Sequence, residues 1–195
     1  MTRIRRYREV GYPVPHKDLR QIRIVAHQMH DWTAGLFPGR GSAIPVIEVI
    51  EYMGSWGSKD YPDYEILEDE EFPGFAANFS PDQMLFRFSL SVWDAASRGD
   101  GAARIDVAHE IGHCALNHPS LAFGRQFAHE IVIKELDSEW QANTFADEYL
   151  MDCRLMTRTT TVSEVMADFM VDEASAARRI HNLMREGCWR SANYQ

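Results

Sequence analysis

Apolar residues recur along the chain at two different periods, and each period predicts its own kind of element. Between residues 15 and 34 the apolar side chains follow one another at steps of three or four, the spacing of one face of an amphipathic helix. The residues on this face are Leu19, Ile22, Ala26 and Met29. We expect this helix to stop near Gly35, and we predict a second, shorter helix for residues 44–53, where Pro45 suits the first turn.

The period of two appears further along, in residues 86–93, where apolar and polar side chains alternate. This alternation predicts a half-buried strand. The apolar members are Phe86, Phe88, Leu90 and Val92. Turn-forming residues at 80–82 and 98–101 bracket the segment. A further short strand is possible between residue 64 and the acidic run Glu68 to Glu71, which we interpret as a solvated turn.

The helical period returns in the second half of the chain and dominates it. It predicts helices over residues 102–118, 137–151, 162–170 and 173–185. Helices that outweigh a few strands, with no internal repeat, indicate an α+β protein. We expect a main domain over residues 1–155, and a C-terminal helical subdomain over residues 156–195 whose helix pair resembles a helix-turn-helix.

Composition and charge restrict the classes of protein that fit this pattern. The 195 residues are 45% hydrophobic and 11% aromatic, which is enough for a substantial core, and the net charge of −9 argues against a surface devoted to nucleic acid. Three widely spaced cysteines suit reduced thiols better than a disulfide framework. We find no signal-peptide pattern and no run of bilayer length, so we expect a cytoplasmic protein with no membrane contact.

The segment His109-Glu110-Ile111-Gly112-His113 is an HExxH motif inside a stretch that the apolar pattern independently predicts to be helical. Residues four apart share a helix face, so the two imidazoles can bind one ion. We predict that His109 and His113 are metal ligands and that Glu110 is the catalytic base, acting on water at the metal. Zinc is the expected cofactor, although two histidines and a carboxylate can also hold Mn²⁺ or Fe²⁺.

A catalytic zinc site needs a third protein ligand and one open position. We choose Glu139 because it begins a predicted helix that can pack against the first. The other acidic residues considered are Glu130, Glu135 and Asp137. One turn after Glu139, Asn143, or failing that Asp147, is expected to hydrogen-bond the outer nitrogen of a ligand histidine.

Two further histidines, His118 and His129, flank the motif in the sequence. We expect them to lie beside the ligands or in solvent and not to bind the metal. For a donor that stabilises the oxyanion of a peptide-cleavage reaction, the candidates are Tyr149, His118 and Arg87. The strand at residues 86–93 is either the cleft edge along which an extended substrate adds a strand or a plain core strand.

Residues 104–113 (RIDVAHEIGH) and 138–150 (SEWQANTFADEYL) resemble the paired signatures of the ImmA/IrrE family of bacterial and phage-borne metallopeptidases. The resemblance covers about half the chain, from residue 86 to 184. It implies a zincin-like core with a small antiparallel sheet, and it makes Glu139 the third zinc ligand. The family often has a histidine eight residues after the first ligand, where Asn117 stands here, and a proline where Asp152 stands.

The resemblance also implies a substrate, because family members typically cut a helix-turn-helix transcriptional repressor in a bacterial, phage or mobile-element regulatory system. Two alternatives remain open. One is a non-proteolytic regulator that binds DNA or a partner through the C-terminal helix pair, which carries Arg178, Arg179 and Arg185. The acidity of the chain favours packing or substrate docking over DNA binding for this pair. The other alternative is the toxin component of a two-gene module.

Overall fold

Helices outnumber strands in the computed structural model of the protein, which describes residues 11–57, 61–74, 76–120 and 133–189. The elements in chain order are α1 (Leu19–Leu36), α2 (Val46–Gly54), β1 (Asp63–Leu67), β2 (Ala77–Ser80), β3 (Leu85–Ser89), α3 (Leu90–Ser97), α4 (Gly101–Ala115), η1 (Lys134–Leu136), α6 (Ser138–Leu150), η2 (Cys153–Leu155), α7 (Val162–Phe169) and α8 (Glu173–Glu186). The α+β class predicted from the sequence is confirmed. None of the helices within these ranges combines the length and the apolar composition that crossing a bilayer demands.

The three strands of the described chain form one mixed sheet in the order β1-β3-β2. Strand β3 pairs in parallel with β1 and antiparallel with β2, so that Phe86 lies opposite both Tyr64 and Phe79. The antiparallel sheet expected from the resemblance is therefore wrong. The reason is the connection after β1, which carries the chain past the position of β3 before β2 begins. Hydrophobic alternation within a strand contains no information on this order of pairing.

The strand predicted for residues 86–93 is only partly correct, because β3 ends at Ser89 and α3 begins at the next residue. The Ser89 side chain caps α3 by accepting a hydrogen bond from the Val92 backbone N–H, at 3.4 Å. Val92 and Ala96 are then buried four residues apart, as one face of a helix requires. A short alternation of apolar residues fits either period, and the N-cap serine decides between them.

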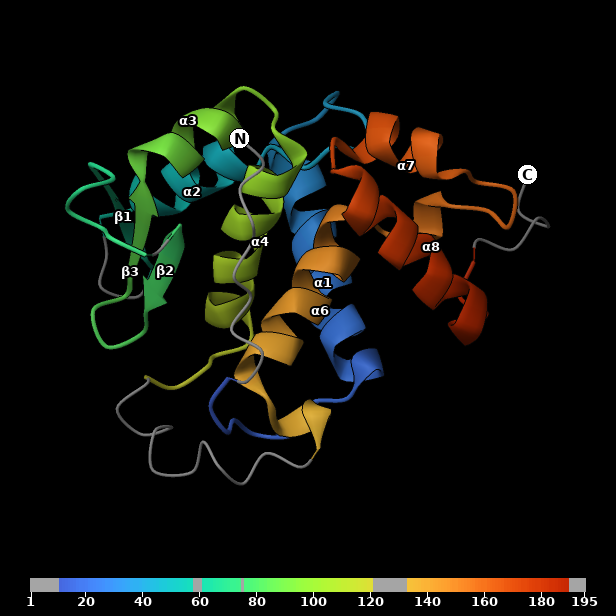
Figure 1. Ribbon diagram of the computed structural model, residues 1–195, viewed down its shortest axis with the longest axis horizontal. Helices are drawn as coiled ribbons and strands as arrows, with labels where there is room; N and C mark the ends of the chain where they lie inside the picture. The colour runs from blue at the N-terminus through green and yellow to red at the C-terminus, as the bar shows by residue number, and fades with distance from the viewer. Residues whose placement is uncertain (1–10, 58–60, 75, 121–132, 190–195) are drawn as a thin grey trace.

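Helix α4 lies at the centre of the molecule, with the sheet on one side and α6 on the other (Figure 1). Gly112 makes the close approach of α4 and α6 possible. A β-carbon built there would lie 3.0 Å from Cδ1 of Phe145 and 3.1 Å from the backbone oxygen of Ala142. Because both atoms belong to the buried face of α6, the glycine sets how near the two helices come.

The C-terminal pair α7 and α8 shares its core with the rest of the chain. Val165, Phe169 and Leu183 belong to the same cluster of buried apolar residues as the sheet and α4. The buried guanidinium of Arg104 in α4 donates to the backbone oxygens of Phe169 and Met170, where α7 ends. The pair thus packs as a cap beside α6 (Figure 1).

Candidate metal centre

The two motif histidines lie one turn apart on α4 and point toward α6. Asp100 caps the start of this helix by accepting a hydrogen bond from the Ala103 backbone N–H. The Nε2 atoms of His109 and His113 are 3.0 Å apart, and His113 is buried. The spacing of four along one helix is therefore sufficient to bring the two imidazole nitrogens to a common point.

Glu139 reaches the same point from the first turn of α6. Its Oε2 lies 3.2 Å from Nε2 of His109, and its Oε1 lies 3.6 Å from Nε2 of His113. Asp137 fixes the start of α6 because its carboxylate accepts the backbone N–H groups of Glu139 and Trp140. The three predicted ligands thus converge, with their ligand atoms within 4.8 Å of one another.

The other acidic residues considered as ligands do not join this group. Asp137 is used as the cap of α6, and it also accepts the backbone N–H of Gly11. Glu135 lies in η1, where its carboxylate is 4.0 Å from Nζ of Lys134. Glu130, like His129, lies outside the described residues.

The separations between the three ligand atoms suit a tetrahedral zinc ion. Metal–ligand bonds of about 2.0 to 2.2 Å with tetrahedral angles put neighbouring ligand atoms about 3.3 to 3.5 Å apart. The observed separations of 3.0, 3.2 and 3.6 Å lie around this value. Two imidazole nitrogens and a carboxylate oxygen are ligand types that zinc accepts in proteins, so the donor set fits a divalent cation.

Each ligand histidine has a partner on its outer nitrogen. Asn143, one turn after Glu139 on α6, places its Oδ1 3.1 Å from Nδ1 of His109. His118 places its own Nδ1 2.9 Å from Nδ1 of His113. Asp147, the alternative to Asn143, instead forms a two-fold hydrogen bond with Arg178. Both Nε2 atoms are therefore left to face the shared point.

Glu110 lies beside the three ligands but is not one of them. Its side chain is buried, and its Oε2 accepts a hydrogen bond of 2.7 Å from the Phe79 backbone N–H of β2. Burial, together with the charge of Glu139, raises the pKa of the Glu110 carboxyl to about 7, although His109 and the Phe79 N–H lower it. A carboxylate with a pKa near neutrality is well suited to exchange a proton with a reacting group.

Tyr12 was not predicted from the sequence, and it also approaches the site. The segment that carries it runs along the start of α6. The Tyr12 backbone N–H donates to Oγ of Ser138, and the Tyr12 backbone oxygen accepts a hydrogen bond from the Ser138 backbone N–H. Burial raises the pKa of its phenol, and the charges of Glu139 and Glu110 raise it further. No sequence signal near residue 12 announces this contact, because it joins segments 126 residues apart.

The candidates for an oxyanion donor are engaged elsewhere. Tyr149 is fully buried, with its hydroxyl 2.8 Å from Oγ1 of Thr33. Arg87 is paired with Glu65 on the neighbouring strand. His118 is held between His113 and Gln141.

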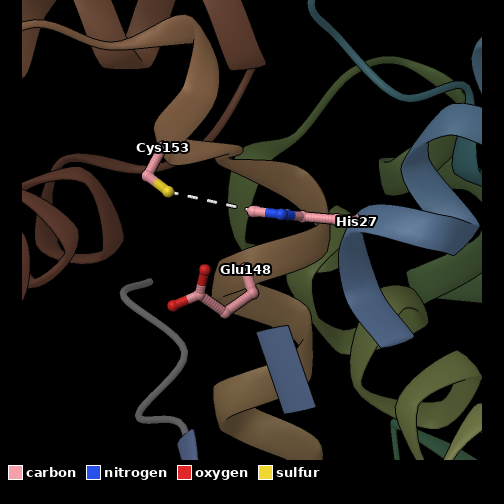
Figure 2. Close-up of side chains that lie close together, drawn as sticks. All are labelled: His27, Glu148 and Cys153. Atoms are coloured by element: carbon pink, nitrogen blue, oxygen red, sulfur yellow. Dashed lines mark hydrogen bonds between the residues drawn. The ribbon is translucent and has the colours of Figure 1, made fainter. Parts of the chain in front are cut away.

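A second group of side chains of types that can bind a metal, His27, Glu148 and Cys153, lies between α1 and the end of α6 (Figure 2). Sγ of Cys153 is 3.9 Å from Nε2 of His27. The Glu148 carboxylate, however, already accepts four hydrogen bonds, two from Arg23 and two from Arg179. With its lone pairs occupied and two guanidinium groups adjacent, this carboxylate does not suit a cation.

A third group, formed by His30, Asp31 and Asp152, is similarly committed. Arg154 binds both carboxylates of this group through its guanidinium. Among the described residues, the group at His109, His113 and Glu139 is therefore the one whose chemistry best fits a metal ion.

Comparison of the chain with protein-family models, with curated proteins and with solved structures gives no match.

Proposed function

We propose that this protein is a zinc-dependent endopeptidase of the ImmA/IrrE type with a zincin-like catalytic core. The observation that carries the proposal is the convergence of His109, His113 and Glu139, with the Glu110 carboxylate beside them and not in ligand position. A catalytic zinc site combines these features: three protein ligands, an open position and an adjacent base.

In this mechanism the residues of the chain have separate roles. His109, His113 and Glu139 hold the ion, which when bound supplies Lewis acidity to water and to a peptide carbonyl. Glu110 takes a proton from the attacking water and gives it to the leaving amine. The Phe79 N–H holds the Glu110 carboxylate in place between these two transfers.

The two segments that carry the family resemblance are the two helices that meet at the site. RIDVAHEIGH lies on α4 and SEWQANTFADEYL on α6. This coincidence supports the family resemblance. From that resemblance we propose that the protein cuts a helix-turn-helix transcriptional repressor in the cytoplasm of a bacterial cell. A helix-turn-helix repressor encoded beside this gene, where there is one, is the first substrate to test.

The test uses three variants of the full chain, each analysed for bound zinc and for cleavage of that repressor. Glu110→Gln should keep zinc and lose cleavage, because an amide cannot take up the proton. Glu139→Ala should lose zinc affinity. Glu135→Ala is the matched control, since Glu135 lies four residues earlier and its carboxylate does not belong to the group of three ligands. Cleavage by Glu110→Gln at the wild-type rate would show that the assigned base is wrong.

The alternative of a DNA-binding regulator depends on arginines of α8 that are engaged with α6. Arg178 binds Asp147, and the buried Arg179 binds Glu148. Two of the three arginines of α8 are thus paired with carboxylates of α6, which supports packing as the role of the helix pair. A gel-shift assay read across salt concentrations tests this alternative. A dedicated antitoxin gene beside this one would favour the toxin alternative.

A further inference from the structure

A chain of hydrogen bonds leads away from His113 on the side opposite the metal position. Nδ1 of His113 lies 2.9 Å from Nδ1 of His118, and Nε2 of His118 lies 3.0 Å from Oε1 of Gln141. The amide nitrogen of Gln141 donates to the backbone oxygens of Pro15, at 2.9 Å, and Glu135, at 2.7 Å. His118 and Gln141 are 2% and 0% exposed, so water does not replace these partners.

The direction of every hydrogen bond in this chain follows from its far end. Backbone oxygens only accept, so the Gln141 amide nitrogen must face them and its Oε1 must face His118. Because Oε1 only accepts, Nε2 of His118 carries a proton. In a neutral imidazole the other nitrogen is then an acceptor, which requires the proton of His113 to be on Nδ1. Nε2 of His113 is left with its lone pair directed at His109 and Glu139.

We propose that His118 and Gln141 are positioning residues that select the tautomer of His113 in which Nε2 can bind the metal. This inference rests on the proposed function for its purpose, although the hydrogen-bond chain itself does not. A ligand histidine with the opposite tautomer would point an N–H at the metal position and could not coordinate without a proton shift.

The backbone brings His118 to this place. Helix α4 ends at Ala115, and Asn117 adopts the left-handed conformation with φ of 53°. Asparagine tolerates this conformation better than most residues, and it turns the chain back toward the helix. The His118 N–H then donates to the backbone oxygen of His113 at 3.0 Å, and the two rings meet nearly edge to face.

In His109 the proton is also held on Nδ1, but by a different partner. Its Nδ1 faces Oδ1 of Asn143 directly, with no intermediate ring. An amide oxygen is an acceptor in every protonation state, whereas His118 is an acceptor only while Gln141 holds its proton on Nε2. The tautomer of His113 therefore depends on residues before α1 and in η1, which supply the carbonyl oxygens of Pro15 and Glu135.

The test compares His118→Leu with His118→Asn. Asparagine has an oxygen at the same number of bonds from Cβ as Nδ1 of histidine, so it keeps an acceptor for His113, while leucine has a similar size and no acceptor. His181→Leu, in which an exposed histidine of α8 is removed, is the control. Thermal unfolding of each zinc-free variant shows that it is folded.

Two quantities are measured on each variant. Long-range ¹H–¹⁵N NMR of the zinc-free protein gives the tautomer of His113, and competition with a chromophoric chelator gives the zinc affinity. We expect Nδ1–H in the wild type and in His118→Asn. We expect loss of this single tautomer in His118→Leu, with zinc affinity lower by about 10- to 100-fold, the usual cost of removing such a partner.

The inference is wrong if wild-type His113 carries its proton on Nε2. It is also wrong if His118→Leu keeps both the Nδ1–H tautomer and the wild-type zinc affinity, or if His118→Asn loses as much affinity as His118→Leu. A wild type with the Nδ1–H tautomer that binds no zinc would support the hydrogen-bond chain and refute the proposed metal site instead.

Discussion

Gly112 offers a direct test of how the packing of α4 against α6 controls the site. In Gly112→Ala the new methyl group would lie 3.0 Å from Cδ1 of Phe145, 3.1 Å from the oxygen of Ala142 and 3.3 Å from its Cα. Two of these atoms are backbone, and Phe145 is fully buried, so none of them can rotate away. The helices must separate by a few tenths of an ångström, which carries Glu139 away from the histidines.

The magnitude follows from two opposing terms. Alanine stabilises a helix interior by about 1 kcal/mol relative to glycine. An extra methylene-sized group in a packed core costs about 1 to 3 kcal/mol. We therefore expect Gly112→Ala to lower the free energy of unfolding by up to about 2 kcal/mol. Gly35→Ala in α1, where a β-carbon meets nothing within 4 Å, should instead leave stability unchanged or raise it.

The assay is urea unfolding of both zinc-free variants, followed by chelator competition for zinc affinity. Gly112→Ala should be less stable than Gly35→Ala and should bind zinc more weakly than the wild type. If it is stabilised as much as Gly35→Ala and binds zinc normally, the close approach of the two helices does not control the site.

Three further predictions concern the contacts that hold the C-terminal helix pair, α7 and α8, in place. The two arginines that bind buried Glu148 hold the pKa of its carboxyl at about 2 although burial opposes them, against an ordinary value of 4.5. This difference contributes about 3 kcal/mol of stability above pH 4.5. Because the pKa in the folded protein is the lower one, this stability is lost as the pH falls from 4.5 toward 2. Urea unfolding of Glu148→Gln should therefore show a smaller loss in the free energy of unfolding over this range than the wild type. Equal losses in the two proteins would contradict the assignment. Arg104→Met should lower the free energy of unfolding by about 3 kcal/mol, because it leaves three backbone oxygens without their donor; a change within the error of the urea titration would be inconsistent with this role. The thiols of Cys153 and Cys188 are 3.1 Å apart, so hydrogen peroxide should join them in a disulfide with release of two water molecules. Burial raises the pKa of the Cys153 thiol to about 12, so little thiolate is present at this residue. In a Cys114→Ser background, thiol titration should show both remaining thiols lost, whereas oxygen addition without cross-linking would count against the pairing.

Much of the candidate site could be predicted because it depends on local geometry. Residues four apart on a helix share a face whatever surrounds them, so the HExxH motif places His109 and His113 together before any packing is known. The choice of Glu139 needed only the start of a second helix and the family resemblance. The hydrogen-bond contact of Asn143 followed from its position one turn later.

Other features depended on strand pairing and side-chain contacts that no local pattern shows, and they were missed. The short strand β2 has only four residues, and its pairing with β3 and its contact with Glu110 arise from the hairpin. Cys153 and Cys188 were interpreted as widely spaced thiols, yet they meet because α8 returns to the end of α6.

The sequence by itself predicted the described α-helices other than α3, and the face of α4 that carries the histidines, since these follow from the period of the backbone. Only the tertiary structure decided the mixed order of the sheet, the engagement of the arginines of α8 with α6, and the partner of His113. The strands and the arginines meet residues far apart in the chain, and His118, although only five residues after His113, is held in place by the distant Gln141. The free energy of these contacts depends on packing and burial that no local pattern contains.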